Sequence, residues 1–351
     1  MRIRFLVPGN VRHGSGGNKY NARLAEHLTA LGVTVEMVSV DGDWPVGSAA
    51  DRKRFAQALD GGTTVIADGL VASGAPEEIA GAVRAGTEVW VLSHMALGEH
   101  HDLEAKALAA ATGIICPSMH SAAELEARHG PLGITVATPG AEPADISGGS
   151  QPKHIVAVAA LLPNKSQTAL VDALATLTDL PWTAALIGSR EADPGYAAEV
   201  RAAVVQHGLQ DRIRVTGELT GQALQDQWKQ ADLSVLISQS ESFGMVVTES
   251  LAHGVPVIVR QGTGAVEALG DTGAGVALDP GESLAGTLRS WLTDHELQDR
   301  WRDNALRARD HLPGWDSTAA TVLRSMTDPR GEPGAEWGHD QHRASHGHPD
   351  P

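Results

Sequence analysis

Two glutamates, Glu241 and Glu249, have the types and spacing that say most about chemistry in this sequence. Seven residues separate them in the segment Glu-Ser-Phe-Gly-Met-Val-Val-Thr-Glu. The apolar run at 233–237 predicts a buried parallel strand before the first acid. Gly254 and Pro256 predict the end of the helix that carries the second acid. Carboxylates in such a segment can bind a ligand by accepting hydrogen bonds.

The elements around the two acids form a predicted strand–helix–strand unit, because a further strand at 255–259 follows the helix at once. This unit places both carboxylates at the carboxyl edge of a sheet, where open α/β folds bind ligands. Spacing alone also allows a solvated loop acid and a helix-surface acid. Gly244 and the turn Gly262-Thr-Gly264 favour the ligand site, since they leave backbone amides available for phosphate.

The segment 241–258 resembles the E-x7-E signature of retaining GT-B glycosyltransferases of family four, the glycosyl transferases group 1. The resemblance covers residues 1–326, and 311–319 is similar to the tail segment of an actinobacterial subgroup. It implies that Glu249 binds the ribose hydroxyls of a nucleotide and that Glu241 contacts the donor sugar. It also implies that the residues between them line the donor site, namely Phe243, Gly244 and Met245.

A basic residue, Lys165, follows the strand predicted at 154–159 and can reach a diphosphate held at helix N-termini, although an ordinary exposed lysine is the alternative. The resemblance implies an arginine five residues earlier and a glycine directly after this lysine. This chain has Ala160 and Ser166 there. Arg190 is one candidate substitute for the missing cation, and Arg260 is a lower-ranked one.

Glycines follow the first predicted strand in the segment Gly-Ser-Gly16-Gly17-Asn18. Glycine lets the backbone approach a ligand closely, and the helix that follows favours negative charge at its start. A glycine-rich turn alone is weak evidence. The resemblance implies that this pair faces donor phosphate and acceptor, with Asn18, Lys19 and Tyr20 lining the cleft.

His94 ends the strand predicted at 88–93, a position where a structural histidine is the common alternative. The resemblance implies that it contacts the donor sugar near the C6 hydroxyl. We therefore predict that Glu241, His94 and Lys165 are the catalytic residues. Asp68, with Gly69 after it, follows the strand at 63–67 and is a weaker candidate for the acceptor side.

Strand-like and helix-like segments alternate along both halves of the chain, which predicts an α/β protein with two Rossmann-like, doubly wound domains facing a central cleft, the GT-B architecture that the resemblance also implies. The remaining strands are predicted at 3–7, 33–40, 113–116, 135–137, 182–187 and 213–216. Helices are predicted at 20–31, 103–111, 118–129, 166–177, 196–207, 221–230, 282–293, 297–311 and 317–326. The predicted divisions are an acceptor-side domain at 1–142, a linker at 143–152, a nucleotide-sugar domain at 153–311, a helix packing back on the first domain at 312–328, and a disordered tail at 329–351.

The bulk composition narrows the function further. The 351 residues carry a net charge of −16, which argues against non-specific nucleic-acid binding and against attraction to an anionic membrane surface. Cys116 is the single cysteine, so an intrachain disulfide is excluded. The short apolar start does not resemble a signal peptide and no apolar run approaches a membrane span, so we expect a cytoplasmic bacterial protein.

We expect no metal site, since no convincing Asp-x-Asp pattern occurs and the tail histidines are better explained by solvated disorder; these are His339, His342, His346 and His348. The resemblance implies metal-independent, retaining transfer of a sugar from a nucleotide sugar to a small-molecule or glycan acceptor, with the donor as co-substrate and no other cofactor. A nucleotide-sugar epimerase and a non-catalytic nucleotide-sugar-binding subunit or sensor are the alternatives. Ala160 favours the last of these.

Overall fold

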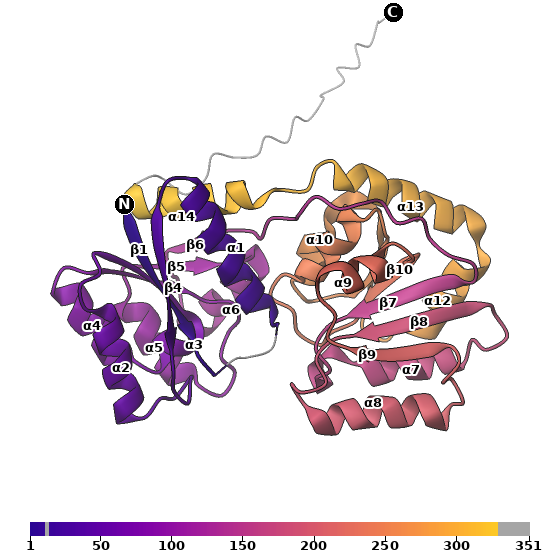
Figure 1. Ribbon diagram of the computed structural model, residues 1–351, viewed down its shortest axis with the longest axis horizontal. Coiled ribbons are helices and arrows are strands. Elements are labelled where there is room, and N and C mark those ends of the chain that lie inside the picture. The colour runs from indigo at the N-terminus through magenta and orange to yellow at the C-terminus, as the bar shows by residue number, and fades with distance from the viewer. Residues whose placement is uncertain (11–13, 329–351) are drawn as a thin grey trace, which may run out of the picture.

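The computed structural model describes residues 1–10 and 14–328, which form two α/β lobes side by side (Figure 1). Each lobe contains one six-stranded sheet in which all neighbouring strands are parallel. The doubly wound α/β fold predicted from the sequence is therefore confirmed. The predicted tail at 329–351, with its histidines, lies outside the described residues.

The N-terminal sheet has the strand order β2-β1-β3-β4-β5-β6. Its strands are β1 (Arg2–Pro8), β2 (Thr34–Val40), β3 (Thr64–Asp68), β4 (Glu88–Leu92), β5 (Gly113–Cys116) and β6 (Ile134–Val136). The chain reverses its direction of strand addition between β1 and β3, so this pair is the topological switch point where such sheets bind ligands. β3 is buried along its whole length, as expected for a central parallel strand.

Helices cover both faces of the N-terminal sheet. Its helices are α1 (Gly16–Ala30), α2 (Ala49–Leu59), α3 (Gly69–Ser73), α4 (Pro76–Arg84), α5 (His101–Ala110) and α6 (Met119–His129). Apolar residues of α1 pack with alternate strand residues such as Phe5 and Ile66 on one face. Residues of α2 to α6 pack with Val65 and Val91 on the other. The alternation along β3 follows from the two-residue period of a strand.

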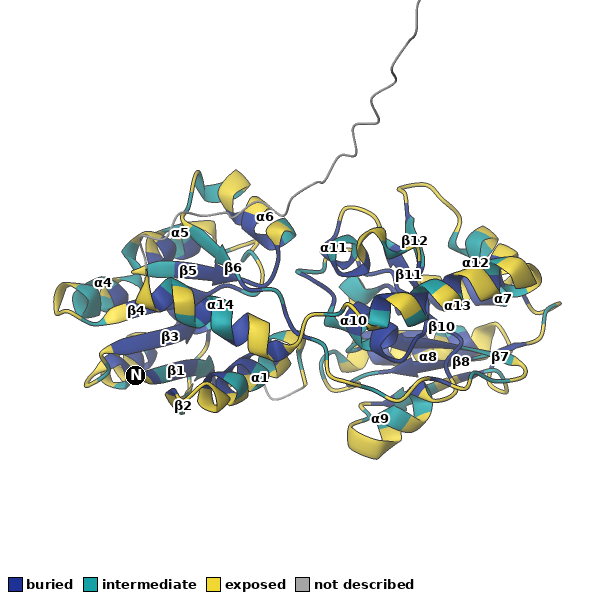
Figure 2. Ribbon diagram, turned by 90° about the horizontal axis from the view of Figure 1, so that it is seen from above, coloured by how far each residue is buried: buried dark blue, intermediate teal, exposed yellow. Residues whose placement is uncertain are grey.

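The C-terminal sheet has the order β12-β11-β10-β7-β8-β9, so its switch point lies between β7 and β10. Its strands are β7 (Lys153–Val158), β8 (Trp182–Ile187), β9 (Ile213–Gly217), β10 (Leu233–Leu236), β11 (Val257–Arg260) and β12 (Gly275–Leu278). Its helical segments are η1 (Pro163–Lys165), α7 (Gln167–Ala175), α8 (Pro194–Gln206), α9 (Gly221–Trp228), α10 (Met245–Ala252), α11 (Ala265–Leu269), η2 (Gly270–Thr272), α12 (Leu284–Thr293) and α13 (His295–Arg309). Figure 2 shows the buried strands of both sheets between helices whose outer faces are exposed.

Two segments cross between the lobes. The first joins β6 to β7, and Ser147 in this segment donates its hydroxyl to the carbonyl of Ala231 at 2.7 Å. The second leads from α13 to the last helix, α14 (Trp315–Thr327), which packs on α1 of the other lobe. Trp315 is buried there, with its ring 5.3 Å from that of Tyr20. Helix α14 therefore belongs to the core of the N-terminal lobe.

The sequence did not predict helices α2, α3, α4 and α11 or strand β12. The helices that it did predict agree with the structure to within a few residues, except that α1 begins at Gly16, four residues before the prediction. In the described residues, no helix is long and apolar enough to cross a membrane.

Candidate active site

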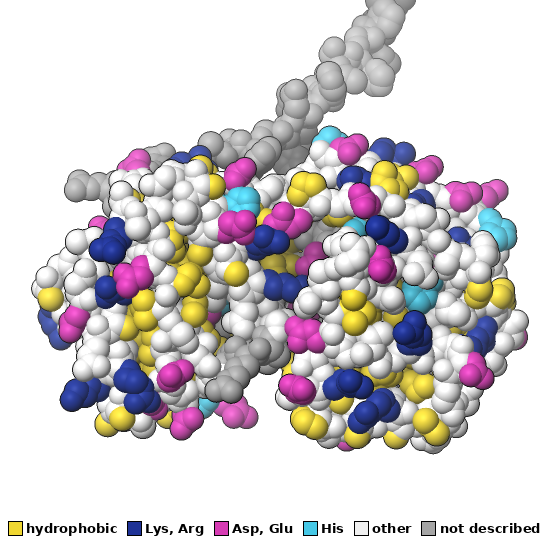
Figure 3. Space-filling model, in the orientation of Figure 1, with side chains coloured by type: hydrophobic (Ala, Val, Ile, Leu, Met, Phe, Trp, Pro, Cys, Tyr) yellow, Lys and Arg dark blue, Asp and Glu magenta, His cyan; other side chains and the backbone are white. Residues whose placement is uncertain are grey.

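A cavity of about 650 Å³ lies between the two lobes, at the carboxyl ends of the strands that meet at each switch point. One wall comes from the loops after β1, β3 and β4, and the other from the loops after β7, β8 and β10. Figure 3 shows charged side chains of both signs gathered where the lobes meet. The predicted site residues line this cavity, except Arg190, Arg260 and the turn 262–264.

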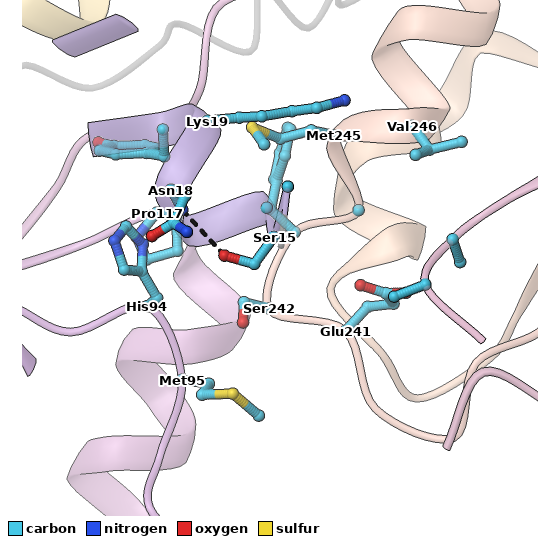
Figure 4. A pocket seen from close by; sticks show the side chains of 18 of the residues that line it. Ser15, Asn18, Lys19, His94, Met95, Pro117, Glu241, Ser242, Met245 and Val246 are labelled. Atoms are coloured by element: carbon cyan, nitrogen blue, oxygen red, sulfur yellow. Dashed lines mark hydrogen bonds between the residues drawn. The ribbon is translucent and has the colours of Figure 1, made fainter. Parts of the chain in front are cut away.

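Glu241 lies on the loop between β10 and α10 and is held by two side chains. The Lys165 ammonium group is 2.7 Å from its Oε1 atom, and the Ser238 hydroxyl donates to the same oxygen at 2.6 Å. These contacts fix the carboxylate next to a positive charge. Figure 4 shows Glu241 among the side chains that line the cavity. The two residues lie 76 positions apart in the chain, and the fold joins them because β7 and β10 are adjacent strands.

The loop of Glu241 is supported from below by Gly264. Its amide donates to the Glu241 carbonyl at 2.8 Å. A Cβ atom at this position would lie 2.0 Å from the Ser242 carbonyl oxygen, so only glycine allows the approach. The prediction that the turn 262–264 presents amides to a diphosphate is therefore wrong for Gly264, whose amide is used inside the domain, and the turn is not among the cavity-lining residues.

The start of α10 instead faces the cavity. Gly244 precedes it with φ of 81°, in the left-handed region that favours glycine, and no side chain caps the first turn. Met245 and Val246 line the cavity at this point. The first amides of a helix lack intrahelical partners and carry partial positive charge, which makes this end suitable for an anion.

Glu249 lies one turn further along α10 and also lines the cavity. Its Oε1 atom is 3.4 Å from the ammonium group of Lys19, which comes from α1 of the other lobe. Both side chains are partly exposed, at 30% for Glu249 and 45% for Lys19. This ion pair bridges the cleft and is weak because water screens it.

The turn that carries Lys165 explains one departure from the family pattern. Ser166, directly after it, has φ of 56° and ψ of 33°, the left-handed conformation that glycine adopts without strain. Ser166 therefore retains the backbone shape that a glycine would favour. Ala160, where the resemblance implies an arginine, lines the cavity without contributing charge.

Neither predicted substitute for the missing arginine lies in the cavity wall. Arg190 is exposed and its guanidinium approaches Gly217, where an added Cβ would be 3.1 Å from Nε. Arg260 donates its Nε to the carbonyl of Ile237 at 3.0 Å and so supports the end of β10. Neither arginine lines the cavity. Arg190 thus lies beside Gly217, exposed to solvent, and does not line the predicted donor site.

On the opposite wall, His94 is held by two polar residues of its own lobe. Its Nε2 atom is 2.8 Å from Asn21 Oδ1 and 3.4 Å from Asp68 Oδ2. The Asn21 amide donates to Asp68 Oδ2 at 2.8 Å, so its Oδ1 atom is the acceptor that faces His94. We therefore assign the proton of a neutral His94 to Nε2.

Asp68 is the buried centre of this group. Burial by itself raises its pKa, but hydrogen bonds from His94, from Asn21 and from the Leu70 amide outweigh burial and hold the pKa below the usual value. Asp68 is only 3% exposed, so it acts through the groups around it. Tyr20 stands behind His94, with ring centroids 5.2 Å apart, and burial raises the pKa of its hydroxyl.

The glycine pair at the start of α1, Gly16 and Gly17, lies close to side chains of both cavity walls. Ser15 caps the helix by accepting from the Asn18 amide at 3.1 Å (Figure 4). A Cβ at Gly17 would lie 3.0 Å from Cδ2 of His94, and one at Gly16 would lie 3.7 Å from Cε of Met245. Gly17 thus lets the histidine approach the helix start, while Gly16 leaves space beside the other lobe.

Sequence reasoning missed several residues that shape the site. Asn21 could have been found, because it is a polar residue on the buried face of α1, beside Tyr20 and Leu24. Glu218, which accepts from the Gly14 amide at 3.2 Å, and Ser238 gave no comparable signal.

Glu267 was also missed, and it joins the lobes at a second place. Its carboxylate accepts from the amides of Met119 and His120, each at 3.0 Å, at the start of α6. Ser121 of the same helix donates to the Ser242 carbonyl at 3.2 Å. The loop after Glu241 is therefore connected to the opposite lobe.

The charges of the described cavity wall are mostly negative. Its two lysines, Lys19 and Lys165, are each paired with a glutamate. Three further carboxylates line it, from Asp68, Glu104 and Glu218. Within 1–10 and 14–328, no cluster of three or more His, Cys, Asp or Glu side chains is arranged to hold a metal ion.

Similar solved structures share this two-lobed architecture. A sucrose-phosphate synthase from Thermosynechococcus elongatus superposes with a TM-score of 0.78 at 17% identity, over 93% of this chain and 98% of that one. Anabaena Alr3699/HepE, in complex with UDP and glucose, gives a TM-score of 0.75 at 19% identity, over 93% of this chain and 100% of that one. At these identities the likeness establishes the fold, which is GT-B.

Curated relatives match over shorter stretches. A D-inositol 3-phosphate glycosyltransferase from Jonesia denitrificans is 32% identical over 176 residues, which are 48% of this chain and 41% of that protein. The lipopolysaccharide core biosynthesis mannosyltransferase LpcC of Rhizobium leguminosarum bv. viciae is 31% identical over 129 residues, 36% of each chain. The matches thus span less than half the length of these relatives.

A match to a known protein family covers the lobe that carries Glu241 and Glu249. Residues 143–308 match the family described as Glycosyl transferases group 1. This range contains Lys165, Glu241 and Glu249, together with the strands and helices that position them. This part of the chain, a little under half of its length, is therefore similar to the glycosyl transferases group 1 family.

Proposed function

We propose that this protein transfers a sugar from a nucleotide-sugar donor to a small-molecule or glycan acceptor, with retention at the anomeric carbon. The proposal includes a cytoplasmic reaction that needs no metal ion and no cofactor besides the donor. The observation that carries it is the arrangement across one cavity of the Lys165–Glu241 pair, the uncapped start of α10 and His94.

The C-terminal wall would hold the donor. Two vicinal ribose hydroxyls can donate to the Glu249 carboxylate once it exchanges its contact with Lys19 for the nucleotide. The diphosphate would lie between the Lys165 ammonium group and the first amides of α10. The complexes of Anabaena Alr3699/HepE with UDP and with UDP-glucose support a nucleotide sugar as the ligand class.

The chemistry follows from the charge that develops when the donor breaks. The departing diphosphate gains negative charge, which Lys165 and the helix start stabilise, while the sugar gains positive charge close to Glu241. These fixed groups can carry the leaving-group charge without a metal. His94 would position the sugar from the opposite wall. The contacts between lobes at Glu218, Glu249 and Glu267 would exclude water and so suppress donor hydrolysis.

Thermal-shift measurements with UDP-, GDP-, ADP- and TDP-sugars test the donor part, because a ligand that binds the folded state raises the melting temperature. We expect one of these to raise it, and Glu249→Ala to remove that shift. Glu199→Ala, an exposed acid on α8 outside the cavity, is the matched control and should keep it. NMR of the anomeric proton in the product then tests retention. A product of inverted configuration contradicts this part of the proposal.

The second candidate is a non-catalytic subunit that binds a nucleotide sugar. Ala160 in the cavity wall favours it, because both lysines that line the described cavity are already paired with glutamates. Tight binding of a nucleotide sugar without hydrolysis or transfer across an acceptor panel would identify this function. Transfer that is lost in Lys165→Ala would exclude it.

A further inference from the structure

The wall of the cavity beyond His94 is apolar. Six residues of the N-terminal lobe form this apolar wall: Leu70, Val91, Met95, Leu97, Leu108 and Pro117. Val91, Leu108 and Pro117 are buried, whereas Met95 is 51% exposed. Figure 4 shows Met95 on the chain that continues from His94, away from Glu241. A ligand that reaches past His94 therefore meets hydrocarbon and a flexible thioether.

Three polar side chains next to the apolar wall, those of Glu104, Asp68 and Ser93, already have partners. Glu104 is 2% exposed, and its two oxygens accept from the Leu97 amide at 2.9 Å and from His129 Nε2 at 2.8 Å. Asp68 accepts from Asn21 and from the Leu70 amide. The Ser93 hydroxyl donates to the Met95 carbonyl at 3.4 Å. These groups hold the wall in shape and leave a polyhydroxylated ligand little to bind.

The charge of this side also disfavours an anionic ligand. In the described part of the chain, no arginine lines the cavity, and its two lysines face the glutamates of the donor side. Arg12 and His13 lie outside the described residues. A phosphate on the acceptor would lose its hydration against hydrocarbon, close to the carboxylates of Asp68 and Glu104. The C-terminal wall differs, since Asn164, Ser189 and Thr220 line it.

We propose that the acceptor is an uncharged, largely apolar molecule with one reactive hydroxyl, such as a phenol or an alkyl alcohol, bound against the apolar wall. This inference rests on the proposed glycosyl transfer. The acceptor oxygen forms a bond to the anomeric carbon, the bond from that carbon to the diphosphate oxygen breaks, and the hydroxyl proton leaves with the nucleoside diphosphate. The products are an O-glycoside of the apolar acceptor and the nucleoside diphosphate.

An acceptor panel tests this substrate class with the full chain and the donor found by thermal shift. We expect kcat/KM for 4-nitrophenol or 1-octanol to exceed that for inositol phosphate, a hexose 6-phosphate and free glucose by tenfold or more. Equal rates, or faster transfer to a phosphorylated or free sugar, overturn the inference. So does failure of every phenol and alcohol to bind in ligand-observed NMR, a readout that needs no turnover.

Variants locate the binding surface. Met95→Gln should raise KM for the apolar acceptor threefold to tenfold, because the loss of apolar contact weakens acceptor binding. Met37→Gln, a 45% exposed methionine on β2 outside the cavity, is the matched control and should leave that KM unchanged. An unchanged KM in Met95→Gln contradicts the inference. If no nucleotide sugar shifts the melting temperature, the result contradicts the proposed function and not the inference about the acceptor. Binding of phenols, measured by NMR, still tests whether the apolar wall binds an apolar molecule.

Discussion

The two sides of the cleft hold their polar groups in different ways. On the N-terminal side, His94, Asp68 and Asn21 bind one another, and the Asp68 side chain is only 5% exposed. On the C-terminal side, Glu241 and Glu249 are paired with lysines whose side chains are 20% and 45% exposed. One group is a closed network within a single lobe. The other consists of two ion pairs, of which the pair between Lys19 and Glu249 is the more exposed to water.

This difference suggests a division of work between the lobes. A buried, satisfied network keeps one geometry, because breaking it leaves polar atoms without partners. A partly exposed ion pair costs little to open, so Glu249 can release Lys19 when a ligand offers hydroxyls. The Lys165–Glu241 pair is more buried and keeps its two charges beside the cavity. We expect variants on the C-terminal side to affect turnover and donor binding most, and variants on the N-terminal side to affect stability together with turnover.

The largest effect should come from the Lys165–Glu241 pair. We expect Glu241→Gln and Lys165→Ala each to lower kcat by about a hundredfold or more, since each removes a charge placed beside the bond that breaks. Steady-state transfer with saturating donor measures this.

The matched control is Lys153→Ala. Lys153 is 2.9 Å from Asp232 and lies at the other end of β7, with similar side-chain exposure of 26%. This variant should lose some stability and keep its turnover. A Lys165→Ala variant that behaves like the control would remove the functional distinction between the two ion pairs.

The next effect concerns Asp68, whose folded pKa lies below its usual value. Such a carboxyl stabilises the folded state above the unfolded pKa, and this contribution is lost as pH falls through the folded pKa. We expect Asp68→Asn to cost about 1–3 kcal/mol of stability at pH 7. The difference from the natural protein should shrink below the ordinary pKa of 3.8. Urea unfolding between pH 7 and pH 3 measures it.

The unfolding measurements on Asp68→Asn are accompanied by a turnover measurement and by a control variant. Turnover of Asp68→Asn should fall about tenfold, since His94 loses a charged partner that orients it. Asp179→Asn is the control, because Asp179 is an exposed carboxyl whose pKa is also held down, by a hydrogen bond from Arg289. Its removal should change stability little. A pH-independent cost in Asp68→Asn would show that the carboxylate charge contributes nothing to stability.

Most strands and helices of the fold were predictable from the sequence. Whether an element could be predicted depended on how strongly its apolar pattern marks it. Strands such as 182–187 are apolar except for one residue, Thr183, and a parallel strand buried on both faces needs a mostly apolar pattern. Helix α2 was missed because its buried face rests on Phe55 and Leu59 among mostly polar residues. Strand β12 was missed because it is four residues long and begins with glycine.

For the site, the sequence located the sheet edge better than it located the contacts. Glu241, Glu249, Lys165 and His94 all follow or lie close to strand ends, so their convergence follows from parallel topology. The partners depend on side-chain directions and on how the lobes face each other. No local pattern connects Lys19 with Glu249, which are 230 residues apart. Arg190 illustrates the same limit, since its place after a strand did not bring it into the cavity wall.

A smaller effect is expected for Lys19, the partner of Glu249 across the cleft. Lys19→Ala should strengthen nucleotide-sugar binding by no more than about threefold, because Glu249 no longer exchanges a partly exposed ion pair for the ligand. Isothermal titration calorimetry of the donor measures this. A loss of affinity of tenfold or more would instead make Lys19 a donor-binding residue and place a binding charge on the N-terminal side.

The smallest effect concerns the turn that presents Lys165. Ser166 holds φ of 56°, and a non-glycine residue in this region is strained by about 1–2 kcal/mol. Ser166→Gly removes that strain but gives the unfolded chain more freedom, which costs about 0.4–1 kcal/mol. We expect a net gain of about 0.5 kcal/mol, measured as a higher urea midpoint for the C-terminal lobe at unchanged slope. Ser166→Ala keeps the strained backbone and should give no gain. Equal gains in both variants would mean that the hydroxyl, rather than the backbone, is unfavourable at this buried position.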